Sequence, residues 1–348
     1  MLESMVQHLV CPDTGAPLRL VVTRQEGREI LEGSLSAGER SYPIRGGVPR
    51  FVEHDKLETA QKDTVDSFSF KWSKIPGYAF ESKTKANREA WYFQRFGFPN
   101  GDADVKAFLS GAKFLLEAGT GTGVDTDLLT RNSDGTVFGV DISSAIDEAY
   151  RRFRGNDRVM LVQGDIGRLP FKPGFFDVVS CDQVLHHTPD PVGNFQKLAS
   201  LLSERGRFLL YVYKVKGALR EFADDHLRGV ATQAPVEVAV DLSERLARLG
   251  RSLSQLHAEV EIEDDLPELG IAKGRYDVQR LIYDHVLKCF WNDDYDFQTN
   301  AMINFDWYRP THAFRYTPVQ VTEWAERAKL HISRLDVSPS GISAVMNR

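Results

Sequence analysis

Apolar residues in the middle of the chain form short runs that alternate with helical or turn-rich segments. Five of these runs are rich in β-branched and aromatic residues and predict strands at 113–116, 136–140, 159–163, 176–180 and 207–213. This alternation is typical of a parallel sheet whose strands are joined by crossover helices. Thr317 and Pro318 then have the pattern of a helix start, and two more strands are predicted at 331–337 and 342–346.

The same pattern divides the chain into four predicted parts: a small β-rich unit at 1–55, a helical linker at 56–110, an α/β core at 111–213 and 317–348, and a helical insertion at 214–316. The first part has turn-rich stretches between short apolar runs. The linker carries aromatic residues at helical spacing, which usually form core. In the insertion, leucines recur every three or four residues at 242–256, which predicts an amphipathic helix.

Composition and charge limit the classes of partner. The formal net charge is −6 without a clear basic patch, whereas proteins that bind nucleic acid through its phosphates usually carry a basic excess. No apolar run approaches the ~18 residues that cross a membrane. Cys11, Cys181 and Cys289 lack paired spacing, which suits a reducing compartment and excludes a four-thiolate zinc site within one chain. These features predict a cytoplasmic protein with a small-molecule ligand.

A glycine-rich loop follows the first strand of the predicted core. Glu117 ends the strand, and Gly119, Gly121 and Gly123 come at alternate positions after it. Glycine is needed where the backbone takes positive φ or where a ligand approaches the main chain closely. A helix that begins after the loop directs its N-terminal amides into the same space, so the loop predicts a nucleotide-binding site.

Two details favour S-adenosylmethionine over a dinucleotide as the ligand of this loop. The dinucleotide fingerprint G-x-G-x-x-G requires a glycine where this chain has Val124. Glu117 faces the loop, where a carboxylate repels a pyrophosphate but can hold a cationic amino-acid group. S-adenosylmethionine carries an ammonium and a sulfonium and no phosphate, so the loop favours this methyl donor over NAD.

Acidic residues also follow the next two predicted strands. Asp141 ends the second strand, where a carboxylate is placed to accept from both hydroxyls of a ribose. Asp165 follows the third strand, where it can accept from an adenine amino group while Ile166 covers a ring face. Each aspartate alone is explained as well by an ordinary turn. Three suitable strand ends in succession predict a nucleoside site.

Four segments, at 117–123, 140–143, 164–166 and 176–179, resemble in order the motifs of class I S-adenosylmethionine-dependent methyltransferases. The resemblance covers about 113–213 and resumes at 317–348. It implies an α/β, Rossmann-like, seven-stranded sheet with helices on both faces and an antiparallel last strand. It also adds Ile142 to the cofactor-binding residues.

The resemblance has implications for three other parts of the chain. Residues after the fourth strand line the cofactor in relatives, which implies cofactor contacts for Cys181 and Asp182. Segments just before the core often close over the cofactor, which implies a lid at 67–72 that includes Phe70. The N-terminal unit resembles a zinc-ribbon-like accessory domain, and we expect a version without metal because only Cys11 remains of the cysteine pairs.

Two histidines, His186 and His187, follow the fourth strand and are candidates for a residue beside the methyl acceptor. Ligands lie outside the carboxyl ends of the strands in an open α/β sheet, so this turn should face the transferred methyl group. One interpretation makes one histidine a general base, and the other is that it caps or packs. A base is needed only when the nucleophile must lose a proton early.

An aromatic and basic segment at the end of the insertion is the candidate acceptor site. Trp307 and Tyr308 can stack on a flat ring, while Arg309 and Arg315 can clamp a carboxylate or phosphate. His312 is a further candidate for a base. The alternative is a packed aromatic corner with surface arginines.

Together, these features predict an S-adenosylmethionine-dependent methyltransferase that modifies an oxygen, nitrogen or carbon atom of a small-molecule metabolite, with specialised biosynthesis as one setting and a homodimer as one assembly. An RNA or protein acceptor is the alternative, which the N-terminal unit favours and the acidic balance disfavours. A cofactor-binding scaffold without catalysis is the third interpretation. It is disfavoured because the glycine loop and both aspartates are intact.

Overall fold

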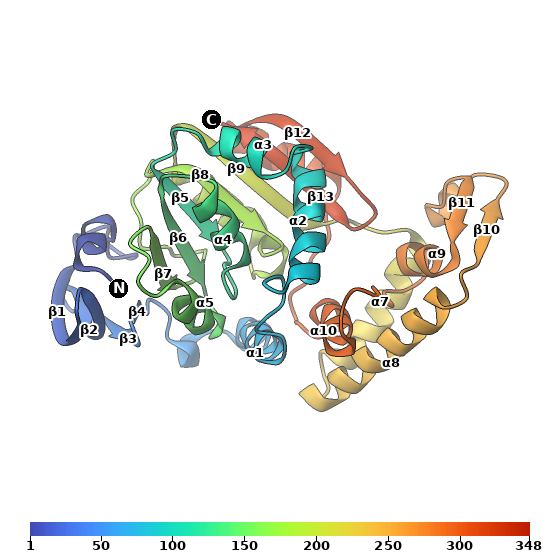
Figure 1. Cartoon of the computed structure of the whole chain (residues 1–348), viewed down its shortest axis with the longest axis horizontal. Coiled ribbons are helices and arrows are strands. Elements are labelled where there is room, and N and C mark those ends of the chain that lie inside the picture. Colours follow the sequence, from blue (N-terminus) through green and yellow to red (C-terminus); the bar gives the residue numbers. More distant parts are fainter.

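The computed structural model describes residues 1–348, apart from the side chain of Ser82. Three parts follow one another along its longest axis: an N-terminal sheet, a central α/β core and a helical insertion (Figure 1). None of the described helices combines the length and the apolar composition that a membrane span requires.

The core is a seven-stranded mixed sheet with the strand order β12-β13-β9-β8-β5-β6-β7. Its strands are β5 (Phe114–Ala118), β6 (Thr136–Asp141), β7 (Val159–Gln163), β8 (Phe176–Asp182), β9 (Leu202–Tyr213), β12 (His331–Val337) and β13 (Gly341–Asn347). Strand β13 runs antiparallel to both β9 and β12, and the other neighbours are parallel. The predicted sheet with an antiparallel last strand is therefore confirmed.

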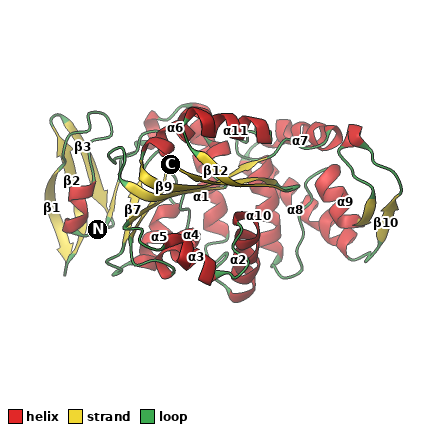
Figure 2. Ribbon diagram, turned by 90° about the horizontal axis from the view of Figure 1, so that it is seen from above, coloured by secondary structure: helices red, strands yellow, loops and turns green.

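Helices cover both faces of this sheet, as predicted (Figure 2). One face carries α2 (Ser82–Phe96), α3 (Asp102–Leu109), α4 (Val124–Arg131) and α5 (Ala145–Phe153), and the other carries α6 (Pro191–Ser200) and α11 (Pro318–Arg327). Successive strand residues point to opposite faces, so Leu115 and Leu116 belong to different hydrophobic clusters, the second shared with Phe195 of α6. Thr317 starts α11 as predicted, since its hydroxyl accepts from the backbone N–H of Gln320.

The N-terminal unit is an antiparallel sheet beside the edge strand β7 (Figure 1). Its strands are β1 (Arg19–Glu26), β2 (Glu29–Ala37), β3 (Arg40–Arg45) and β4 (Val48–Pro49), with short helical turns η1 (Glu3–His8) and η2 (His54–Lys56). The backbone N–H of Phe51 donates to the carbonyl of Gln163 (2.8 Å), which joins the unit to the core. The described residues contain no cluster of three or more metal-ligating side chains, and the zinc-ribbon resemblance stays a prediction.

The insertion between β9 and β12, the fifth and sixth strands of the core along the chain, is mainly helical, as predicted. It contains α7 (Ala218–Ala231), α8 (Val236–Ser254), β10 (Glu259–Ile262), η4 (Pro267–Leu269), β11 (Gly274–Asp277), α9 (Val278–His285) and α10 (Phe297–Tyr308). The leucine repeat falls largely on α8, where Leu246 is buried, but Leu249 and Leu256 are exposed. The acidic stretch after it forms part of a hairpin, β10–β11, that the sequence pattern did not predict.

Candidate functional site

A cavity of about 660 Å³ opens at the carboxyl ends of the core strands. Its walls come from the loops after β5, β6, β7 and β8, from α1 (Thr59–Lys74) and α2, and from α9 and α10 of the insertion. This volume is within the range of small-molecule sites. The cavity lies where the strand order reverses, between β5 and β8, which is where open α/β sheets bind ligands.

The glycine loop between β5 and α4 lines one end of the cavity. Gly119 (φ 93°) and Gly121 (φ 53°) both face it in the left-handed region, and a Cβ on Gly119 would lie 2.1 Å from a methyl group of Val184. The third glycine, Gly123 (φ 94°), lies outside the lining and precedes α4, where it packs against Phe153. Its role is therefore the turn into the helix.

Glu117 is buried at the end of β5 and lines the same end of the cavity. Its Oε2 accepts from Oγ1 of Thr120 (2.8 Å) and from the hydroxyl of Thr126. Burial raises the pKa of Glu117 well above its ordinary value, and the nearby carboxylate of Asp125 raises it further. A cationic group in the cavity would favour the ionised form of Glu117.

Asp141 lies at the end of β6 with Ile142, and both line the cavity. Its Oδ2 accepts from the backbone N–H of Gly121 (2.7 Å), and its Oδ1 accepts from the backbone N–H (2.8 Å) and hydroxyl (2.6 Å) of Ser143. An ionised carboxylate has about four acceptor positions, so three bonds orient Asp141 and leave capacity for a ligand.

Asp165 and Ile166 line the cavity beyond β7. Asp165 accepts from the backbone N–H of Gly167 (2.7 Å) and from the side-chain amide of Gln61 (2.7 Å) on α1. The three predicted strand ends are thus brought to one cavity, and α1 is tied directly to the third of them.

One face of α1 covers the cavity. Gln61, Phe68 and Trp72 recur at helical spacing and all line it. Phe70, the residue predicted for the lid, lies outside the lining and packs against Phe305 of α10 at 5.5 Å between ring centroids. At about 100° per residue, Phe70 points away from the face that carries Phe68 and Trp72.

Asp182 lines the cavity at the end of β8, but two arginines of α2 already bind its carboxylate. Arg95 donates to both oxygens (2.5 Å each), and Arg88 donates to Oδ2 (2.6 Å) and to Asp125 (3.0 Å). Burial opposes ionisation, yet the two guanidinium groups hold the pKa of Asp182 below its ordinary value. The neighbouring Cys181 is fully buried in β8 outside the lining.

The two arginines were not among the site residues predicted from the sequence. Arg88, Trp91 and Arg95 recur at positions i, i+3 and i+7, which places them on one face of α2. Arginines on the buried face of a helix require buried acids, and this was the signal available in the sequence.

The structure separates the two histidines of the short helical turn η3 (Leu185–His187). His186 is fully buried, stacks on Tyr213 at 3.7 Å between centroids, and neither ring nitrogen has a hydrogen-bond partner among the described residues. His187 lines the cavity beside Phe68, and its Nδ1 lies 2.6 Å from the carbonyl oxygen of His312. The ring of His312 lies outside the lining and stacks on Phe314.

The carbonyl of His312 determines the tautomer of His187. A carbonyl can only accept, so Nδ1 of His187 carries the proton and Nε2 has the free lone pair. Burial lowers the pKa of His187 to about 3, which keeps the ring neutral at physiological pH. Of the three predicted base candidates, His187 is the one whose side chain lines the cavity.

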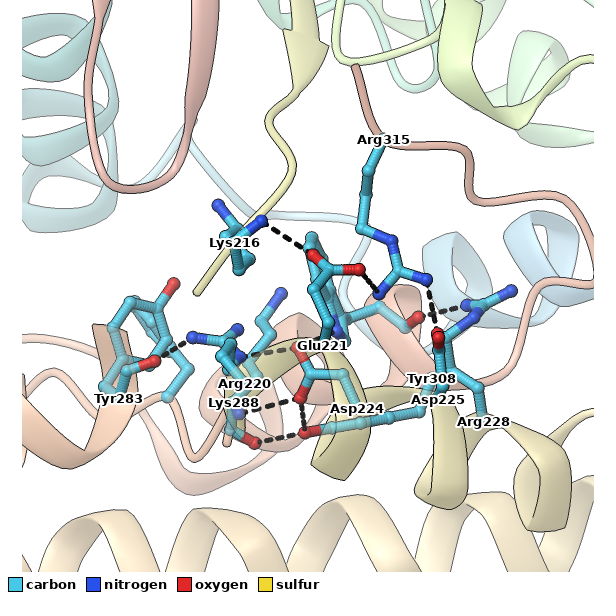
Figure 3. A network of polar contacts seen from close by, with 12 residues as sticks. Lys216, Arg220, Glu221, Asp224, Asp225, Arg228, Tyr283, Lys288, Tyr308 and Arg315 are labelled. Atoms are coloured by element: carbon cyan, nitrogen blue, oxygen red, sulfur yellow. Dashed lines mark hydrogen bonds and ion pairs between the residues drawn. The ribbon is translucent and has the colours of Figure 1, made fainter. Parts of the chain in front are cut away.

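The aromatic residues of the predicted acceptor segment divide into one that lines the cavity and one that supports it. Trp307 lines the cavity, and its indole N–H donates to Asp224 of α7 (2.9 Å). The hydroxyl of Tyr308 donates to the same carboxylate (2.8 Å) from a fully buried position outside the lining. The hydrogen bond from Tyr308 to Asp224 (Figure 3) therefore supports the carboxylate that also binds the indole of Trp307.

The two predicted arginine clamps are bound to carboxylates of the protein. Arg309 pairs with Asp63 of α1 (2.6 Å), and Arg315 pairs with Glu221 (2.9 Å) and Asp225 of α7 (Figure 3). Neither arginine lines the cavity. These ion pairs hold the end of the insertion against α1 and α7. The sequence did not reveal them, because the acidic partners of Arg309 and Arg315 are distant along the chain.

The match of residues 116–210 to the family model Methyltransf_11, described as a methyltransferase domain, defines the class of this core. The matched region runs from β5 to β9 and includes the glycine loop, Asp141, Asp165 and Asp182. The chain thus carries a methyltransferase domain, and S-adenosylmethionine is the cofactor of that domain.

Individual relatives match the same region. The 27-O-demethylrifamycin SV methyltransferase of Amycolatopsis mediterranei is 34% identical over 101 residues, which are 28% of this chain and 37% of that protein. The ubiquinone biosynthesis O-methyltransferase of Neisseria meningitidis is 26% identical over 116 residues, 32% of this chain and 47% of its own. The chain therefore spans less than half the length of these relatives.

Among solved structures, the 1,6-didemethyltoxoflavin-N1-methyltransferase of Burkholderia thailandensis is similar with a TM-score of 0.41 and 13% identity. The similarity covers 90% of this chain and 96% of that one.

Proposed function

We propose that the protein transfers a methyl group from S-adenosylmethionine to an oxygen, nitrogen or carbon atom of a small molecule, in the cytoplasm. The observation that carries this proposal is the shared cavity: Glu117, Asp141 and Asp165 line one end, and insertion residues such as Trp307 line the other. Adjacent strands lie ~4.8 Å apart, so the ends of β7 and β9 are roughly 19 Å apart across four spacings. Such a cavity is long enough for a donor and an acceptor together.

The residues at the donor end fit S-adenosylmethionine. Asp141 would bind the ribose, Asp165 the adenine amino group and Glu117 the ammonium. Arg88 lines the same space, and its second terminal nitrogen is buried without a hydrogen-bond partner among the described residues, which suits the donor carboxylate. When bound, the donor supplies a methyl group attached to a positively charged sulfur. On transfer of the methyl group, the sulfur keeps the electron pair of the broken carbon–sulfur bond and becomes a neutral thioether.

His187 is the proposed general base, which removes the proton when the nucleophilic atom of the methyl acceptor carries one. Its Nδ1 is held by the His312 carbonyl, so Nε2 is the nitrogen that can take the proton. Asp306 lies close enough to favour the protonated ring. The rest of the barrier would be lowered by orientation of the two reactants in one enclosed cavity.

Single replacements of His186 and His187 by glutamine distinguish a histidine that acts as a base from one that only packs. His187→Gln is expected to lower kcat about 100-fold or more with unchanged affinity for S-adenosylhomocysteine, because it removes Nε2. His186→Gln is expected to lower thermal stability, because it disturbs the stack on Tyr213, while kcat per folded molecule stays within about twofold. Equal kcat values in the two variants would contradict this assignment.

The proposed function is tested with donor carrying a labelled methyl group and a cell extract divided into dialysable and macromolecular fractions. Transfer of label into the dialysable fraction supports a small acceptor. Label in the macromolecular fraction alone would point instead to RNA or protein. Binding of S-adenosylhomocysteine in calorimetry without any labelled product would favour a non-catalytic scaffold.

A further inference from the structure

The acceptor end of the cavity carries more positive than negative charge. Lys71, Lys216, Arg220 and Lys288 line it beside the ion pair of Arg280 with Asp284, whose charges cancel. The carboxylates within ion-pair distance of the four other cations are those of Asp224 and Asp306. With all four groups protonated, the cations would exceed these carboxylates by two charges in a largely buried space, and burial accordingly lowers the pKa values of Lys216 and Lys288. Such an excess is costly unless a ligand or solvent compensates it.

The partners of these groups show where compensation is missing. Asp306 pairs with both Lys71 (2.6 Å) and Lys288 (3.3 Å), so one carboxylate serves two ammonium groups. Asp224 pairs with Arg220 (2.5 Å) and also binds Trp307 and Tyr308.

Lys216 differs from the other three cations. Its ammonium donates to the backbone carbonyls of Ser340 (2.7 Å) and Pro339, and it forms no ion pair among the described side chains. The nearest acid along the chain, Glu221, accepts from the backbone N–H of Lys216 and pairs with Arg315 (Figure 3). Burial lowers the pKa of Lys216 well below its ordinary value, with Arg220 as the next cause. An anion beside Lys216 would restore its charge.

The two lysines converge on one aromatic surface. The ammonium of Lys216 lies 5.6 Å and that of Lys288 5.2 Å from the ring centre of Trp307. Tyr213 packs on the same indole at 4.5 Å between centroids, and Tyr283 lines the cavity nearby. Two cations over the indole of a cavity wall suit a ligand whose flat apolar body packs beside the aromatic side chains and whose negatively charged substituent reaches the ammonium groups.

We propose that the methyl acceptor is an aromatic oxyanion whose carboxylate or phosphate is bound by Lys216 and Lys288 beside Trp307. This inference rests on the proposed methyl transfer and names the class of its acceptor. The anion-binding groups are thus lysines inside the cavity, while Arg309 and Arg315 serve ion pairs within the protein.

Binding of matched probes to the complex with S-adenosylhomocysteine tests the proposal by calorimetry. The anions are benzoate, 4-hydroxybenzoate and phenyl phosphate, and the neutral counterparts are benzamide and 4-hydroxybenzamide. We expect at least one anion to bind about tenfold or more tightly than the amides, because an ammonium forms charge-assisted hydrogen bonds with an oxyanion. The preference between benzoate and phenyl phosphate distinguishes the two anionic groups.

Two variants locate the effect. Lys216→Met is expected to abolish the preference for anions and to leave the affinity for S-adenosylhomocysteine unchanged, which also shows that the variant is folded. Lys273→Met removes one charge from an exposed position of the same insertion outside the cavity lining, and it should retain the preference. If Lys216→Met unfolds, Lys288→Met provides the same test.

The outcomes keep the two proposals distinct. Anions and amides that bind equally, anions that do not bind at all, or a preference that survives both lysine replacements would overturn the anionic acceptor and leave methyl transfer standing. Failure of the native protein to bind S-adenosylhomocysteine would instead overturn the proposed function. If Lys273→Met loses the preference for anions to the same extent as Lys216→Met, the preference arises from the overall surface charge. This result would also overturn the assignment.

Discussion

The Asp182→Asn variant is expected to lose about 3–5 kcal/mol of unfolding free energy, the largest effect on stability that we predict. The native carboxylate is 1% exposed and binds both Arg88 and Arg95, whose side chains are 8% and 3% exposed. Asparagine keeps the shape and removes the charge, so two buried guanidinium groups would share Asp125 alone. Urea unfolding followed by circular dichroism measures the loss.

A surface pair provides the matched control for this experiment. Asp157 pairs with Arg28 at 2.7 Å, but both side chains are largely exposed, so Asp157→Asn should cost less than about 1 kcal/mol. Adding Arg95→Met to Asp182→Asn should recover part of the stability, because it removes one unpaired buried charge. A loss below about 1 kcal/mol for Asp182→Asn would show that the buried network does not anchor α2 to the sheet.

The Asp141→Ala variant is expected to bind S-adenosylhomocysteine about 100-fold more weakly than the native protein. The charge-assisted hydrogen bond from the ribose to the remaining acceptor position of the carboxylate would be lost, and about 100-fold corresponds to about 2.7 kcal/mol. The substitution also removes the acceptor for the backbone N–H groups of Gly121 and Ser143, which loosens the loop around the donor. Isothermal titration calorimetry gives the affinity directly, without an acceptor.

The opposite end of the same strand supplies the control. Asp134 is exposed just before β6, so Asp134→Asn changes the same charge far from the cavity and should leave the affinity within about twofold. Asp141→Asn, which keeps one carbonyl oxygen, should fall between the two. If Asp141→Ala binds the ligand as tightly as the native protein, the assignment of the ribose site fails.

The prediction of the core from sequence succeeded where the signal is local. Strands β7 and β12 have the predicted bounds, β6 and β8 end one and two residues later than predicted, and β5 begins one residue later and ends two residues later. Strand β9 begins five residues earlier than predicted, because Leu202 pairs with Phe176 ahead of an irregularity in the register. The hairpin β10–β11 was missed because each strand has only four residues and β10 lies within an acidic run, although Glu259 to Ile262 do alternate polar and apolar positions.

The sequence by itself determined the sheet, the glycine loop and the acidic strand ends, because each depends on residues close together in the chain and on the edge where parallel strands end. The tertiary structure alone decided which charged side chains remain available to a ligand. Arg309 is neutralised by Asp63, 246 positions away, and Asp306 by Lys71, 235 positions away. Ion pairing at such separations follows from how α1 and the insertion pack together, and no local pattern encodes it.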